Sequence, residues 1–306
     1  MSEQFRGVYA IPPTPFTDDD QVDEPSLRRC VDFCVQNGAD GIVAPVNASE
    51  GPFLTDGERR RVVEIVVEQT NRRVPVVAGV SAQSTRATVE YARQAEAAGA
   101  DAVMAMPPFI RHPSSDEIPL FYAELGRATR LPIWVQNYVA PVGTPMSAAL
   151  VARLLREIEN VQYVKEETAL APQLMTQIKA LAGDACKGIM GGMAGRFLLD
   201  EHARGACGTM PACEAVDAHA AVWAALESGD DALARERFRL LLPLLTYEAM
   251  YSVVVYKEVL KRRGVIASAK VRAPGSPSLD EAGHLELDRI LADLAPLLKT
   301  PVSLWS

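Results

Sequence analysis

The chain has 306 residues, of which 48% are hydrophobic and 23% are charged. This balance is typical of a globular protein with a full core, and α/β barrels routinely reach this length as one domain. With 39 acidic against 31 basic residues, the net charge of −8 argues against nucleic acid or an anionic membrane as the main partner. An anionic substrate would therefore have to be met by local groups rather than by the overall field.

The sequence shows neither a targeting pattern nor a metal-binding pattern. Its first residues lack a basic start followed by an apolar core, and no apolar run approaches the ~20 residues of a membrane span. The five cysteines are an odd number without a small-scaffold pattern, and the four histidines lack metal-ligand spacing. We therefore expect a protein of the reducing cytoplasm, without a metal or bound cofactor, that neither binds nucleic acid nor enters a membrane.

Short apolar segments alternate with helical patterns along most of the chain. Strands are expected where apolar residues run together between Gly, Pro or Asp, at 7–11, 40–46, 74–80, 101–108, 131–138, 161–165, 187–191 and 205–210. Helices are expected where capping residues precede helical apolar spacing, at 24–37, 55–69, 85–98, 119–129, 147–158, 171–181, 196–203 and 217–228. The result is eight strand–helix units in succession.

This repeating unit selects the fold. Several helices end in Gly-Ala-Asp, as at 38–40 and 99–101, where glycine suits the left-handed cap. Apolar strands alternating with helices imply a parallel sheet, and eight units favour a (β/α)₈ TIM barrel, which we assign to 1–229. The remainder, 230–306, has helical patterns at 231–247, 253–263 and 280–298. We expect it to form an appended helical layer packed on the barrel.

The segment VQYVKEET at 161–168 ends an apolar strand in Lys165. Lysine is rarely buried without a reason, and the carboxyl end of a barrel strand is where such folds keep their chemistry. Burial favours the neutral amine, which attacks carbonyl carbons to form a Schiff base. The alternative is a structural lysine paired with Glu166 or Glu167.

Two further loops follow predicted strands at the same end. The run Asn47, Ala48 and Ser49 offers backbone N–H groups and a hydroxyl to a substrate carboxylate, although it also fits an ordinary turn capped by Glu50. The glycine-rich run that begins at Gly191 superficially resembles a phosphate loop, but no complete phosphate-binding motif is present. Its glycines are expected to let substrate or the Lys165 side chain approach the backbone.

At this point the sequence resembles the Schiff-base aldolase and lyase family that includes dihydrodipicolinate synthase and N-acetylneuraminate lyase. The resemblance covers essentially the whole chain, and its motifs are GV at 7–8, TPF at 14–16, NASE at 47–50, PVVAGV at 75–80, MPPF at 106–109 and VKEET at 164–168. It implies that Lys165 is the Schiff-base lysine, because this residue stands where the family has it. It also implies a tetramer, so we expect a homo-oligomer.

The departures from the family pattern narrow the expected activity. The family commonly has Tyr-Asn after the fifth strand, whereas this chain has Gln136 and Asn137, with Tyr138 expected on the same strand face as Gln136. Phe109 replaces a second relay tyrosine, and residues 141–142, Pro-Val, replace the arginine that binds the synthase's second substrate. Dihydrodipicolinate synthase activity is therefore not expected.

The chain is most similar to the branch of 2-keto-3-deoxy sugar acid dehydratases, in particular 2-keto-3-deoxy-L-arabonate dehydratase. The similar stretches are VMAMPP at 103–108, VQ at 135–136, REIE at 156–159 and GVIAS at 264–268. We expect a Schiff-base lyase that dehydrates a 2-keto-3-deoxy sugar acid, with Lys165, Tyr138 and Gln136 as catalytic residues. Substrate-binding residues are expected to be Asn47, Ala48, Ser49, Asn137 and Gly191.

Three alternatives stay open at the level of sequence. The nearest is an aldolase that releases pyruvate from the same iminium, and a related one is deamination of a cyclic imino acid. The third is a non-catalytic barrel that binds small carboxylates, because both relay tyrosines of the family are missing.

Overall fold

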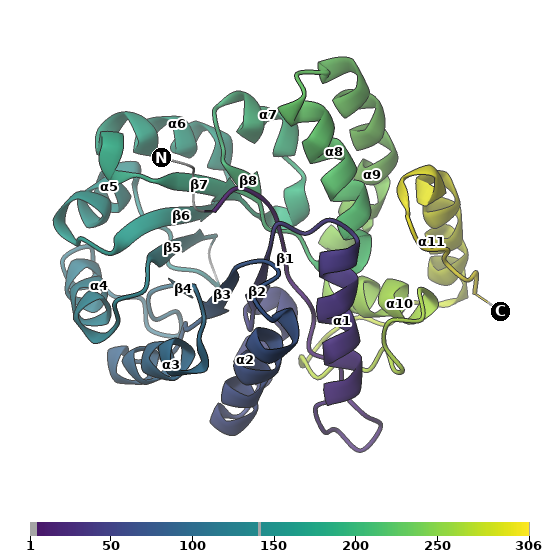
Figure 1. The fold of residues 1–306 in the computed structure, drawn as a ribbon, viewed down its shortest axis with the longest axis horizontal. Helices are drawn as coiled ribbons and strands as arrows, with labels where there is room; N and C mark the ends of the chain where they lie inside the picture. Colours follow the sequence, from purple (N-terminus) through teal and green to yellow (C-terminus); the bar gives the residue numbers. More distant parts are fainter. Residues whose placement is uncertain (1–4, 140–141, 306) are drawn as a thin grey trace.

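The computed structural model describes residues 5–139 and 142–305. Eight parallel strands form a closed barrel in the order β1 to β8, and Figure 1 shows the helices around it. The strands are β1 (Gly7–Ala10), β2 (Gly41–Ala44), β3 (Val76–Gly79), β4 (Ala102–Ala105), β5 (Ile133–Tyr138), β6 (Val161–Glu167), β7 (Gly188–Gly191) and β8 (Gly208–Thr209). The predicted (β/α)₈ TIM barrel is confirmed.

The barrel helices follow the strands in turn. They are α1 (Glu24–Gln36), α2 (Asp56–Thr70), α3 (Thr85–Ala98), α4 (Glu117–Ala128), α5 (Ala148–Glu157), α6 (Ala171–Ala182), α7 (Leu198–Ala203) and α8 (Val216–Glu227). Their starts follow local chemistry, as in the capping box in which Thr55 and Glu58 satisfy each other's backbone N–H at the start of α2. The bounds expected from sequence deviate by one or two residues, because helix ends depend on such caps.

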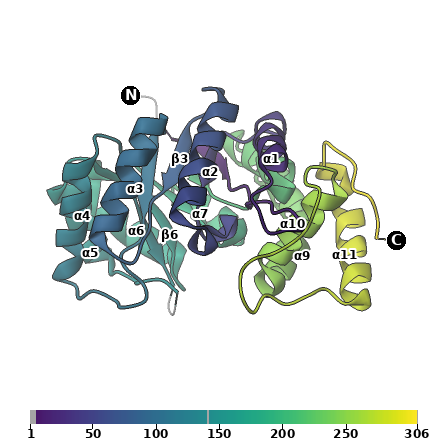
Figure 2. The same ribbon diagram turned by 90° about the horizontal axis from the view of Figure 1, so that it is seen from below.

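Three helices follow the barrel: α9 (Asp231–Tyr251), α10 (Val253–Arg262) and α11 (Glu281–Leu294). Figure 2 shows them together on one side of the barrel. Buried residues of α9, α10 and α11 belong to the same hydrophobic cluster as those of α1 and α8. The last predicted helix ends earlier than 298, because Pro296 has no N–H to continue it and a 3₁₀ turn follows at Ala295–Leu297.

Aromatic side chains fill the amino-terminal part of the barrel interior. Phe5, Trp134 and Tyr163 are all buried, and the rings of Trp134 and Tyr163 stack with centroids 4.6 Å apart. Phe5 meets the Tyr163 ring edge-on at 5.0 Å. Because inward-facing residues alternate along a strand, Lys165 lies one step above Tyr163 on the same face. Lys165 therefore lies directly above a layer of packed aromatic side chains.

Within the described residues, no helix combines the length and the apolar character that crossing a membrane requires.

Candidate active site

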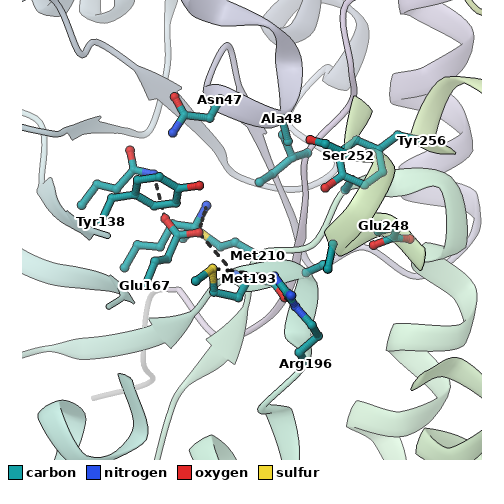
Figure 3. Close-up of a pocket in the computed structure, with 16 residues that line it drawn as sticks. Asn47, Ala48, Tyr138, Glu167, Met193, Arg196, Met210, Glu248, Ser252 and Tyr256 are labelled. Atoms are coloured by element: carbon teal, nitrogen blue, oxygen red, sulfur yellow. Dashed lines mark hydrogen bonds and ion pairs between the residues drawn. The ribbon is translucent and has the colours of Figure 1, made fainter. Parts of the chain in front are cut away.

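A cavity of about 210 Å³ opens at the carboxyl end of the barrel and is closed on one side by the appended helices. Its polar lining comes from β5, β6, the loops after β2 and β7, and α9 and α10. The lining residues are Ile11, Asn47, Ala48, Gln136, Tyr138, Lys165, Glu167, Met193, Ala194, Arg196, Met210, Ala212, Glu248, Ala249, Ser252 and Tyr256. Figure 3 shows these side chains around one space.

Lys165 projects into this cavity from β6 and is 3% exposed. Its Nζ lies 3.3 Å from Oε1 of Glu167, two residues further along the strand on the same face. Glu167 is also buried, so the two side chains form an ion pair largely shielded from water. An amine next to a carboxylate in such a site has a proton acceptor within reach.

Gln136 faces Lys165 across the pairing of β5 with β6. Its Nε2 donates a 2.8 Å hydrogen bond to Oε2 of Glu167, and the backbone N–H of Met193 donates to Oε1 at 3.3 Å. Met193 adopts a positive φ of 51°, which turns its N–H toward the carboxylate. The amide that replaces the family's tyrosine therefore holds Glu167 in place beside the lysine.

Tyr138 lines the cavity on the same face as Gln136, as strand alternation predicts. Burial raises the pKa of its phenol, and the charge of Glu167 raises it further, although Arg196 acts in the opposite direction. The phenol is consequently neutral near pH 7 and is a hydrogen-bond donor to the cavity.

Two residues expected to bind substrate do not reach the cavity. Asn137 points the opposite way along β5: its amide N–H donates to the Met146 carbonyl at 3.0 Å and to Glu166 at 2.8 Å. Gly191 pairs with Glu166, which faces away from the cavity, rather than with Lys165. A side chain at Gly191 would therefore point outward, where its Cβ would collide with the carboxylate of Glu201. The physical reason in both cases is the two-residue period of a strand.

The neighbouring Gly192 gives room to Glu167, rather than to the substrate or the Lys165 side chain expected from the sequence. A Cβ at Gly192 would collide with the carboxyl group of Glu167. The glycines of this loop therefore give room to two glutamates, one on each side of the barrel wall.

The loop after β2 forms one edge of the cavity. Asn47 and Ala48 line it, and Ser49 is fully buried directly behind them in the 3₁₀ turn Asn47–Ser49. Neither Nδ2 of Asn47 nor Oγ of Ser49 has a hydrogen-bond partner. Both atoms are shielded from the cavity, so the part of this loop that a substrate can reach is at Asn47 and Ala48.

The appended layer holds this loop. Glu50 has a left-handed φ of 56°, is fully buried and forms an ion pair with Lys257 of α10. Its other oxygen accepts hydrogen bonds from the backbone N–H groups of Arg272 and Ala273, both at 2.7 Å. Burial lowers the pKa of Lys257 to about 8, although Glu50 acts to raise it. Glu50 is thus a link between the cavity loop and the appended layer rather than a simple turn cap.

Sequence reasoning overlooked part of the cavity wall. Glu167 was considered only as an ion-pair partner, although its two-residue spacing from Lys165 predicts a shared face. Glu248, Ser252 and Tyr256 reach the cavity from α9 and the start of α10. No local signal marks them, because their place depends on how the appended helices pack.

Residues at other positions singled out from sequence lie beside the site. Phe109, with no hydroxyl, lines an adjoining apolar groove together with Val142 and Tyr138. Pro141 lies outside the described residues.

Across the described ranges, no group of three or more His, Cys, Asp or Glu side chains is placed to hold a metal ion.

The dihydrodipicolinate synthetase family model matches residues 4–294 of the chain. The chain is 36% identical over 303 residues to an L-2-keto-3-deoxyarabonate dehydratase from Azospirillum brasilense, with 96% of both chains covered. It is 33% identical over 301 residues to a 4-hydroxy-tetrahydrodipicolinate synthase from Acidobacterium capsulatum, covering 94% of this chain and 95% of that relative.

Solved structures of this family superpose on the chain over almost its whole length. A dihydrodipicolinate synthase from Rhodopseudomonas palustris superposes with a TM-score of 0.87 at 27% identity, over 96% of this chain and 99% of that one. A prophage protein of the dihydrodipicolinic acid synthase family from E. coli K12, in complex with pyruvate, gives a TM-score of 0.87 at 25% identity, over 96% and 99%. The chain therefore belongs to the dihydrodipicolinate synthetase family, a family of lyases.

Proposed function

We propose that the protein is a Schiff-base dehydratase acting on a 2-keto-3-deoxy sugar acid of the 2-keto-3-deoxy-L-arabonate type. The observation that carries the proposal is the buried Lys165 amine 3.3 Å from the Glu167 carboxylate, inside the cavity at the carboxyl end of the barrel. The 36% identity to an L-2-keto-3-deoxyarabonate dehydratase over nearly the whole chain favours this substrate class.

The reaction begins when Glu167 takes a proton from the Lys165 ammonium and the freed amine attacks the C2 ketone. Proton transfers convert the adduct to a carbinolamine, which loses its oxygen as water to give the iminium. Glu167 returns this proton to the carbinolamine oxygen and is ionised again when water leaves. Asn47 and Ala48, which line the cavity, bind the substrate carboxylate in this proposal, with Ser49 buried behind them. No cofactor is required, because the lysine itself supplies the electron sink.

Glu167 is the proton carrier in this proposal. The iminium acidifies C3; Glu167 removes one C3 proton and leaves an enamine. The enamine electrons expel the C4 hydroxyl, and Glu167 returns its proton to that oxygen, which departs as water. The Gln136 amide keeps the carboxylate oriented, and the Tyr138 phenol is a further donor for the departing hydroxyl.

The aldolase alternative uses the same iminium but breaks C3–C4 and releases pyruvate. It would require Glu167 to take the proton of the C4 hydroxyl instead of a C3 proton. The second relative is named a synthase rather than a dehydratase, so the family includes more than one activity. Product identity separates the two.

The test follows 2-keto-3-deoxy-L-arabonate by NMR with purified enzyme. The expected product is the dehydrated 2-oxo acid, and stoichiometric pyruvate would reject dehydration. Lys165→Ala should abolish turnover, whereas Lys187→Ala, at an exposed lysine before β7, should leave it unchanged. Turnover by Lys165→Ala would reject the covalent mechanism.

We further propose a homo-oligomer, a tetramer by family resemblance, that works in the cytoplasm. An apolar groove next to the active site supports the oligomer, since Phe53, Ile110 and Val142 on its walls are exposed at 41, 75 and 48%. Light scattering on a size-exclusion column measures the mass, and a single 33.1 kDa species would contradict the assembly.

A further inference from the structure

The active-site cavity contains a cationic side chain that the proposed mechanism does not use. Among the described residues that line the cavity, Lys165 and Arg196 are the two with cationic side chains. Arg196 directly follows the 3₁₀ turn Met193–Gly195 in the loop after β7. Because the chain has a net charge of −8, local cations of this kind have to attract an anionic or strongly polar substrate.

The guanidinium of Arg196 is held in place but has donors to spare. Its Nε donates a 2.9 Å hydrogen bond to the backbone carbonyl of Met193, and Nη2 lies 3.8 Å from the sulfur of the same residue. Nη1 has no hydrogen-bond partner among the described residues, and no carboxylate in that part of the chain forms an ion pair with the guanidinium. A guanidinium has five N–H donors, so most of them are available to a ligand of this half-buried side chain.

The backbone of Met193 fixes the position of Arg196 relative to the reacting lysine. Its carbonyl accepts the hydrogen bond from Arg196, and its N–H donates to Oε1 of Glu167, the oxygen that lies 3.3 Å from Nζ of Lys165. One residue thus connects the arginine to the ion pair at which the substrate would bind covalently.

Arg196 lies on the side of the cavity opposite to the loop after β2. Figure 3 shows Asn47 and Arg196 at opposite edges of the space. In the proposed function C2 is bound to Lys165 and the carboxylate lies at Asn47, so the distal carbons extend toward Arg196. Glu248 also lines the cavity, but its carboxyl oxygens are shielded and cannot receive the ligand.

We propose that Arg196 is a specificity-determining residue that binds an acceptor oxygen at the end of the substrate distal to the 2-oxo acid. A guanidinium donates charge-assisted hydrogen bonds to hydroxyl oxygens, and it binds a carboxylate through two parallel bonds. An alkyl end displaces water from the guanidinium without replacing the lost hydrogen bonds. The substrate class is therefore 2-oxo acids that carry a hydroxyl or a carboxylate on the distal carbon.

This proposal rests on the proposed function for the direction in which the substrate lies. Three ligands isolate the distal group: 5-hydroxy-2-oxopentanoate, 2-oxoglutarate, and 2-oxopentanoate, which has no distal oxygen. None carries a C4 hydroxyl, so none can be dehydrated. Calorimetry measures the Kd of each for wild type and for Arg196→Met, and because each ligand is compared with itself, its hydration and ring closure in solution cancel from the ratio.

Arg196→Met should raise the Kd of the two oxygen-bearing ligands about ten- to hundredfold, the range of charge-assisted hydrogen bonds, and should leave that of 2-oxopentanoate nearly the same. Arg196→Lys keeps one charged donor and should recover part of the loss. A larger loss for 2-oxoglutarate assigns the subsite to a carboxylate, and a larger loss for the hydroxy acid assigns it to a hydroxyl.

Arg235→Met is the matched control, because Arg235 is an exposed arginine of α9, and thermal unfolding establishes that each variant is folded. An equal rise in Kd for all three ligands would overturn the proposal, because it would place Arg196 at the shared 2-oxo acid or give it a structural role. Unchanged Kd values in Arg196→Met, or failure of wild type to bind any of the ligands, would overturn it as well.

Borohydride trapping separates this proposal from the proposed function. A Lys165 adduct with unchanged ligand ratios in Arg196→Met would overturn only the role of Arg196. Ratios that change as expected, without any adduct on Lys165, would instead overturn the proposed chemistry and leave the distal subsite standing.

Discussion

The two walls of the active-site cavity are built on different principles. The strand wall, formed by β5 and β6, places Gln136, Tyr138, Lys165 and Glu167 through the two-residue period of paired strands. The helix wall, formed by α9 and α10, places Glu248 through the packing of helices outside the barrel. In the proposed mechanism the first wall carries the covalent chemistry and the second faces the far end of the substrate.

The comparison indicates which wall of the cavity tolerates amino-acid substitution. The strand wall is tied together by hydrogen bonds among its own side chains, so changing one member displaces the others. The helix wall meets the barrel through side chains such as the Lys257–Glu50 ion pair. Residues of the helix wall can therefore be substituted while Lys165 and Glu167 stay in place.

The largest expected effect is on the strand wall, at Glu167. Glu167→Gln keeps the hydrogen-bonding shape but cannot accept a proton, so kcat should fall by about 10²–10⁴, the range for a general acid–base group. Stopped-flow and steady-state kinetics measure the change. Glu159→Gln, at an exposed glutamate preceding the same strand, is the control. A loss below tenfold would assign the proton transfers to another group.

The next largest effect concerns the connection between the two walls. Lys257→Met leaves Glu50 buried with only backbone donors, and breaking a buried pair in this way costs about 3–5 kcal/mol of unfolding free energy. Urea unfolding measures this loss. Because Glu50 ends the turn that carries Asn47, KM should also rise more than kcat falls. Unchanged stability would show that the appended layer does not hold the loop.

A smaller effect, on the pH dependence of the unfolding free energy, is expected at Glu201 of α7, behind the strand wall. Burial raises the pKa of this carboxyl to about 8, with further contributions from the charges of Glu167, Asp200 and Glu166. A raised carboxyl pKa means that the folded state retains a proton that the unfolded chain has lost. The contribution of the Glu201 proton to the free energy of unfolding is therefore largest below about pH 4.5. It is lost as the pH rises to about 8.

Glu201→Gln removes this dependence. Relative to wild type, the variant should gain on the order of 3–4 kcal/mol of unfolding free energy between pH 5 and pH 8.5. Urea unfolding at the two pH values measures the difference, with Glu236→Gln as the control at an exposed acid of α9. Parallel pH profiles for wild type and Glu201→Gln would contradict the assignment.

The smallest effect is expected at Tyr138. Its phenol supports the departing hydroxyl without being the proton carrier, so Tyr138→Phe should lower kcat only about three- to tenfold, as the loss of one hydrogen bond does. Steady-state kinetics measures the loss of kcat. The control is Tyr91→Phe, at a tyrosine outside the cavity. A loss as large as that of Glu167→Gln would make Tyr138 the proton carrier instead.

The sequence predicts the barrel and much of the strand wall for a physical reason. Apolar periodicity and capping residues are local, so β6 and the position of Lys165 can be read from a few adjacent residues. The same alternation could have separated Tyr138 from Asn137 and assigned Glu167 to the cavity. The partners of Gly191 required knowledge of strand register, which is set by the closed sheet.

The helix wall could not be predicted from sequence. Glu248 lies in a long helix with more leucines than one apolar face requires, and its place in the cavity wall depends on tertiary packing. The pairing of Lys257 with Glu50 spans 207 positions. Such contacts depend on the angle and depth at which a helix packs, and neither is encoded in local spacing.

The most direct test of the central claim is to trap the covalent intermediate. Wild-type protein incubated with 2-keto-3-deoxy-L-arabonate or pyruvate and borohydride should gain the mass of the reduced adduct, and peptide mapping should locate it on Lys165. Lys165→Ala should gain no mass under the same conditions. An unmodified wild-type Lys165, or an adduct on another lysine accompanied by full activity, would contradict the account.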